Sequence, residues 1–244
     1  MKPEMKLERP PYVHNWVRTI GPDLQSTVSK LVHLALGFPA KTYVAATPII
    51  RDRIATSLDR ETAMMAALTT GRTNSRQIVA EYVSAFFEYD EVRRYSGKPT
   101  FDEMVEPFRI SKGLFVPVKP LINIVENGRV TPIFSVGWAT YPLTKFQTRL
   151  LATVIEDAVF SLTDFRKSPG EFLCFPKQGS VRKPLVWNRG DVDLLSDGER
   201  RDCLEMYVQA LEIAKETLRS VPERGSPKPQ HKRDTDPNQF SLDV

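Results

Sequence analysis

Cysteine and histidine are scarce in this sequence, which has two and three of them among its 244 residues. Cys174 and Cys203 lie among apolar neighbours and form no C-x-x-C pair, so we interpret both as reduced thiols with a packing role. His14, His33 and His231 are far apart, and no H-E-x-x-H spacing occurs. The sequence therefore predicts no metal site.

Long apolar runs are also missing. No segment approaches the roughly 18 apolar residues of a membrane span, and the charged start, Met1 to Lys6, is no signal peptide. The chain has no P-loop, no G-x-G-x-x-G fingerprint and no G-x-S-x-G elbow. We expect a cytoplasmic protein that has no membrane partner and no bound cofactor.

The charge balance is only mildly basic. Lys and Arg number 34 against 30 Asp and Glu, which gives +4. The tail from Glu223 to Val244 is neutral, so the surplus lies in the body and is spread thinly. Such a distribution lacks the concentrated basic patch of many nucleic-acid-binding proteins.

The composition and the positions of proline and polar residues predict one folded domain with a further segment at each end. Pro10-Pro11 favours extended backbone, so we expect an arm over 1–22. A single α/β domain follows over 23–222, and its first part, 23–72, has helical spacing. The polar, proline-bearing segment 223–244 is predicted to be disordered.

The middle of the chain alternates between helical and strand patterns. We predict a helix near 75–95, strands at 113–118, 121–125 and 130–136, a long helix from 142, and strands at 171–175 and 184–187. Asn127-Gly128 predicts a hairpin between the second and third strands. The expected fold class is α/β (α+β), with N-terminal helices, a small mixed sheet and a C-terminal helix.

The C-terminal helix, 197–221, carries a narrow apolar seam spaced by three and four residues. Docking on the body of the same chain is the favoured use of this seam. The alternative is a homo-oligomer that pairs through this helix.

The order helix, three strands, helix, strand over 75–187 resembles the core of the PD-(D/E)XK nuclease-like superfamily. Its members often carry Pro-Asp before the second strand and Glu-x-Lys on the third. Here Pro120 is followed by Leu121, and the third strand holds Phe134 and Val136 at the Glu and Lys positions. A shift of one residue brings Ser135 and Gly137 instead.

This resemblance implies a fold without its chemistry, since such nucleases use clustered carboxylates to hold a divalent metal. Gln147 matches a glutamine that some members place on the following helix, but a single glutamine does not bind a catalytic metal. If the carboxylates have moved, the nearest candidates are Glu126, Glu156 and Asp157.

Two further segments are candidates for binding a partner. Trp138 and Tyr141 can stack on nucleic-acid bases beside the basic pair Arg182-Lys183, although filling a gap between sheet and helix is the commoner role of such aromatics. The last residues resemble the bacterial sliding-clamp-binding motif through Gln239, Phe240, Leu242 and Val244.

The leading hypothesis is a non-catalytic protein with a nuclease-like core that binds DNA or a partner protein in bacterial or mobile-element DNA metabolism. The alternatives are a metal-dependent nuclease with relocated carboxylates and a structural or regulatory interaction module.

Overall fold

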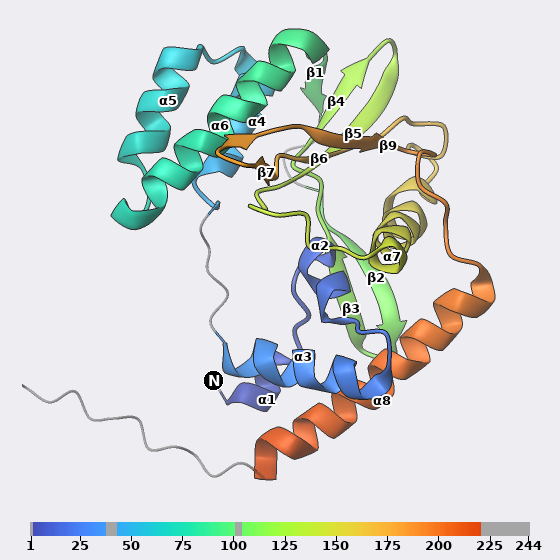
Figure 1. Cartoon of the computed structure of the whole chain (residues 1–244). Coiled ribbons are helices and arrows are strands. Elements are labelled where there is room, and N and C mark those ends of the chain that lie inside the picture. Colours follow the sequence, from blue (N-terminus) through green and yellow to red (C-terminus); the bar gives the residue numbers. More distant parts are fainter. Residues whose placement is uncertain (1, 38–42, 101–103, 221–244) are drawn as a thin grey trace, which may run out of the picture.

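The computed structural model describes residues 2–37, 43–100 and 104–220. A five-stranded mixed sheet crosses the molecule, and helices cover both of its faces (Figure 1). The α/β class, the small mixed sheet and the C-terminal helix predicted from the sequence are confirmed.

The strands of the main sheet lie in the order β1 (Lys98–Thr100), β4 (Ile122–Glu126), β5 (Arg129–Val136), β6 (Glu171–Cys174) and β9 (Leu185–Asn188). Only β5 and β6 are parallel; the other neighbours are antiparallel. The parallel pair is connected through α7 (Lys145–Ile155) and the π-helical turn η2 (Glu156–Phe160).

The predicted β4–β5 hairpin is confirmed. Asn127 and Gly128 have φ angles of 50° and 73°, as a two-residue hairpin turn requires. Glu126 and Arg129 are consequently cross-strand partners.

The predicted strand at 113–118 forms, but in a different sheet. Here β3 (Leu114–Val118) pairs with β2 (Glu106–Ser111) as a separate ribbon, and another short ribbon joins β7 (Lys177–Gln178) to β8 (Val181–Arg182). Beside β4 the main sheet instead uses β1, whose sequence is Lys-Pro-Thr. Proline and lysine are typical of an edge strand, and so short a polar strand has no periodic signal.

Alternating residues divide the core between the two faces of the sheet. One face, with Ile124, Ile133 and Leu173, packs against α6 (Thr73–Arg93), α4 (Ala46–Thr56) and α5 (Arg60–Thr69). The other face, with Phe134 and Phe172, packs against α7, α3 (Leu24–Leu36), α8 (Asp197–Ser220) and the β2–β3 ribbon.

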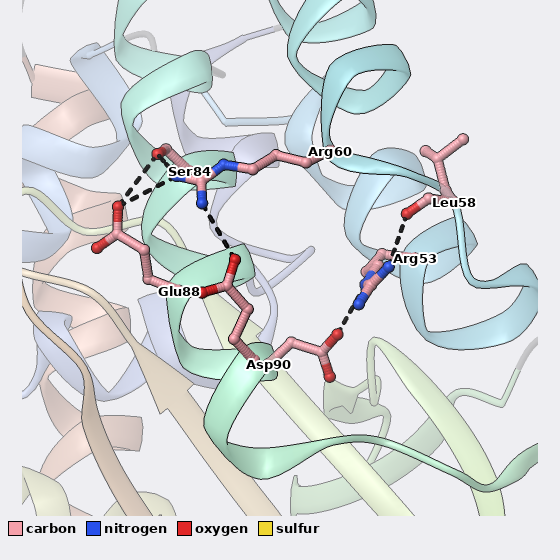
Figure 2. A network of polar contacts seen from close by, with 7 residues as sticks. Arg53, Leu58, Arg60, Ser84, Glu88 and Asp90 are labelled. Carbon is pink, nitrogen blue, oxygen red and sulfur yellow. Dashed lines mark hydrogen bonds and ion pairs between the residues drawn. The ribbon is translucent and has the colours of Figure 1, made fainter.

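Two arginines connect α4 and α5 to α6 (Figure 2). The Arg53 guanidinium donates to Asp90 at 2.7 Å and to the Leu58 carbonyl at 3.0 Å. Arg60 donates to Ser84 at 3.0 Å and also contacts Glu88 and Glu91. Figure 2 shows both side chains reaching from their own helices toward α6.

The N-terminal segment differs from the expected extended arm. It contains α1 (Pro3–Lys6), α2 (Val13–Trp16) and the 3-10 turn η1 (Val17–Thr19). Its apolar side chains are buried in the same core as α3, α7 and α8: Leu7, Val13, Trp16, Val17 and Ile20. The two prolines shape the connection between α1 and α2, and burial of these apolar residues determines where the segment lies.

The seam of α8 is used within the chain, as the favoured interpretation predicts. Its buried residues are Cys203, Tyr207, Ala210, Leu211, Ala214 and Leu218. Tyr207 packs edge-on against Trp16, with ring centroids 5.4 Å apart. Homo-oligomerisation through α8 stays a prediction. Within the three described ranges, no helix combines the length and apolar character needed to cross a membrane.

Candidate functional site

The residues at the nuclease-like positions lie where β4 begins and β5 ends. Leu121, Ser135 and Gly137 line one cavity of about 30 Å³, together with Tyr43, Thr47, Ile50 and Tyr82. Phe134 and Val136 belong to the core on the opposite face of the sheet. Because strand residues alternate between faces, the shifted register is the one that faces Leu121.

This cavity is closed by aromatic side chains. The Tyr82 hydroxyl lies 2.5 Å from Ser135 Oγ. A Cβ atom on Gly137 would come within 2.2 Å of the Tyr43 ring, so position 137 has no room for a longer side chain. Burial raises the pKa of Tyr82 well above its usual range, and this phenol therefore stays protonated.

A buried arginine lies behind these aromatic rings. Arg182 is 4% exposed, and its guanidinium donates to the carbonyls of Phe175 at 2.6 Å and Trp138 at 3.2 Å. The same group donates to the Tyr43 hydroxyl at 2.6 Å. It also lies over the rings of Tyr43 and Tyr82, 5.3 and 5.7 Å from their centroids. The guanidinium is thus held at this end of the sheet by contacts within the protein, and Glu81 Oε2 lies 4.0 Å from its Nε.

Gln147 has a structural environment. It is 4% exposed and completes a capping box with Thr144 at the start of α7. Its amide nitrogen donates to the Ile20 carbonyl at 2.7 Å, and this hydrogen bond connects the N-terminal segment to α7. The side-chain amide is therefore occupied by contacts within the protein.

The alternative carboxylates do not converge on a common site. Glu126 is bonded to Arg93 at 2.6 Å and Glu156 to Arg189 at 2.5 Å, while Asp157 pairs with Arg200. Each of these three carboxylates is therefore paired with a different arginine, and Arg93 and Arg200 each contact a second carboxylate as well. Across residues 2–37, 43–100 and 104–220, no three His, Cys, Asp or Glu side chains gather in a way that could hold a metal ion.

Glu126 belongs to a buried polar network that the sequence did not reveal. Arg93, at the end of α6, donates from Nε to Glu171 at 2.6 Å and from Nη2 to Glu126 at 2.6 Å. The Tyr95 hydroxyl donates to the other oxygen of Glu171 at 2.5 Å. Although burial opposes it, hydrogen bonds from Arg93 and the Ser96 backbone hold the pKa of Glu126 below its usual value.

This network lines a cavity of about 420 Å³. The cavity lies at the hairpin end of β4 and β5, the opposite end of the sheet from Leu121 and Ser135. The sequence contains one indication that Glu171 has a special role, because this charged residue begins a strand that is otherwise apolar. Nothing in the sequence linked it to Arg93 or Tyr95.

Trp138 and Tyr141 lie side by side, with ring centroids 5.9 Å apart, and both are half-buried against the core. The His14 ring meets Trp138 at 6.1 Å, and Arg18 lies 5.9 Å from the Trp138 ring centroid. Lys183 is exposed. Arg182, its neighbour in sequence, is buried, so this arginine is not part of the surface that the sequence suggested.

The predicted clamp-binding residues Gln239, Phe240, Leu242 and Val244 lie outside the described residues, and the motif stays a prediction. No protein-family model matches this sequence, and no curated protein matches it either.

Proposed function

We propose that this chain is a non-catalytic cytoplasmic protein with a nuclease-like core that binds DNA. One observation carries the proposal. The main sheet takes β1, β4 and β5 between α6 and α7, and β6 after α7, which is similar to the helix, three strands, helix, strand order, although β1 takes the place of the predicted strand 113–118. The Asp position holds Leu121, and the Glu and Lys positions hold Phe134 and Val136 or, with a shift of one residue, Ser135 and Gly137.

The surroundings of these residues support the absence of catalysis. Metal-dependent hydrolysis needs carboxylate ligands and room for a metal-bound water. The cavity here has a volume of only about 30 Å³, and its lining includes no acidic residue. The guanidinium of Arg182 adds positive charge nearby, bonded to Tyr43 of the same lining.

The DNA-binding part rests on Arg18, Trp138, Tyr141 and Lys183. Arg18 and Lys183 are exposed and carry positive charge toward solvent. Trp138, which lies close to Arg18, and its neighbour Tyr141 add half-buried aromatic area. Phosphates attract cations of this kind, and unpaired bases stack on aromatic rings. We infer a weak interaction that is independent of DNA sequence.

The test measures the binding of fluorescently labelled single-stranded and duplex DNA by anisotropy over a series of salt concentrations. Binding at low salt should weaken as salt rises. Lys183→Ala should reduce the dependence of log K on log[salt] by about 0.7–0.9, the share of one phosphate contact. Lys112→Ala, which removes an exposed lysine from the β2–β3 turn, is the matched control and should change nothing.

Two results would overturn the proposal. Absence of binding at low salt removes the DNA partner. Cleavage of DNA in Mg²⁺ or Mn²⁺ that is lost in Glu126→Gln removes the non-catalytic part and favours the alternative with relocated carboxylates.

A further inference from the structure

The cavity of about 420 Å³ lies where α6 ends and leaves part of the sheet uncovered. Its wall comes from the β4–β5 hairpin, the start of β6, the end of β9 and Arg93 of α6. This volume falls within the range of small-molecule sites. Apart from Pro169, the residues that line it are polar or charged, unlike those of the apolar core under α6.

Strand register explains why polar side chains gather there. Glu126 is opposite Arg129, and Thr131 is opposite Ile124. Glu171 is opposite both Ile133 and Asn188. Directly opposed residues project from the same face of a sheet, so all of these side chains share the face that α6 covers. The apolar pair Ile124 and Ile133 lies under the helix, and the polar residues lie beyond its end.

Negative charge is in excess on the wall of the cavity that is formed by Glu126 and Glu171. Two carboxylates, Glu126 and Glu171, share one guanidinium, that of Arg93, which leaves one negative charge in excess on that wall. Each carboxylate has about four lone-pair directions, and the contacts from Arg93, Tyr95 and Ser96 do not use all of them. This wall therefore still accepts hydrogen bonds, best from a cation.

The other side of the cavity offers donors. Arg129 is adjacent to Glu126 across the hairpin, yet its guanidinium forms no hydrogen bond or ion pair with any described residue. Thr131 is 2% exposed, and its hydroxyl has no hydrogen-bond partner among the described residues. A buried hydroxyl without a partner is costly, and a ligand that approaches the floor of the cavity would supply one.

We propose that this cavity binds a small zwitterion of the amino-acid class. The ligand's carboxylate pairs with Arg129 and accepts from Thr131, and its ammonium group donates to Glu126 and Glu171. Both excess charges are then matched by one molecule, and Arg93 keeps the two carboxylates in place before the ligand arrives. This inference does not depend on the proposed DNA binding.

The experiment is isothermal titration calorimetry of the full chain with each proteinogenic amino acid in turn. Acetate and phosphate serve as probes with an anion alone, and putrescine as a probe with amines alone. We expect at least one amino acid to bind with a Kd below about 1 mM, and the probes that carry charge of only one sign to bind far more weakly. Arg129→Ala should weaken binding at least about tenfold, and Thr131→Val should weaken it several-fold.

Arg109→Ala is the matched control, because Arg109 is also an exposed strand arginine but lies on β2, outside this lining. Thermal melts of the variants check that each is folded. Three results would overturn the proposal: no amino acid binds, acetate or putrescine binds as well as the best amino acid, or Arg129→Ala binds like the unaltered chain.

Discussion

The pKa of His14 lies well below that of a histidine in water. Burial lowers its pKa to about 4, and the nearby Arg18 guanidinium acts in the same direction. The unfolded chain carries an ordinary histidine with a pKa of 6.5, so between these two values the unfolded state binds more protons than the folded state.

The free energy of unfolding should therefore fall as the pH drops from 6.5 toward 4, by on the order of 2–3 kcal/mol from this residue. Urea unfolding measured at intervals between pH 7 and 4.5 tests this. Carboxylates with lowered pKa values, such as Glu126, lose most of their contribution below pH 4.5, so they add little over this range. His14→Gln should flatten the profile, and equal slopes in both proteins would contradict the assignment.

For single residues, the sequence predicts which catalytic side chains are absent, but it does not predict which distant side chains contact one another. Leu121 in place of a carboxylate is readable directly. Whether Phe134 or Ser135 lies on the same side of the sheet as Leu121 depends on which face of β5 packs against α6, and the tertiary packing determines that. The contact between Arg93 and Glu171 joins residues 78 positions apart, and no local pattern encodes such a pairing.

Helices α4 and α5 are attached to α6 by two arginines that differ in burial, and this difference predicts different costs. Arg53 pairs with Asp90, which is 5% exposed, and lies 4.9 Å from the Phe87 ring centroid. Arg60 pairs with Glu88 and Glu91, whose side chains are 56% and 61% exposed.

Arg53→Ala should lower the free energy of unfolding by about 3 kcal/mol, because it leaves the buried Asp90 carboxylate without its cation. Arg60→Ala is the matched control on the neighbouring helix, and solvent-exposed ion pairs are worth no more than about 1 kcal/mol. Urea denaturation of the two variants measures both values. Equal losses would show that burial of Asp90 is not what makes the Arg53 contact important.

The elements with clear periodicity could be predicted from the sequence. Helix α7 and the Asn127-Gly128 hairpin follow from apolar spacing and turn chemistry. Strand β1 and the ribbon partner β2 carry proline and charge, so their local preference is weak and long-range pairing decides their conformation. Similarly, the proline-based prediction of an N-terminal arm overlooked Val13, Trp16 and Val17, which packing draws into the core.

At the scale of the whole molecule, both ends of the described chain enter one core. Trp16 is fully buried and packs against Phe108 and Tyr207, at ring-centroid distances of 6.2 and 5.4 Å. Trp16→Ala should therefore cost about 3–5 kcal/mol of unfolding free energy. Met5→Ala, at a residue that is 48% exposed, should change it by no more than about 0.5 kcal/mol. If 1–22 were an independent arm, the two variants would unfold alike.

The contact between Trp16 and Tyr207 also constrains how the protein is made. A ribosome releases α2 and η1 well before their packing partner α8 is synthesised. During most of translation, the apolar side chains of α2 and η1 therefore have no final position to occupy. The layer formed by α4, α5 and α6 with the sheet requires nothing after Val186 and can form earlier. The nascent chain should thus acquire its two layers one after the other, and α2 and η1 should reach their native positions after α4, α5 and α6, although they are synthesised before them.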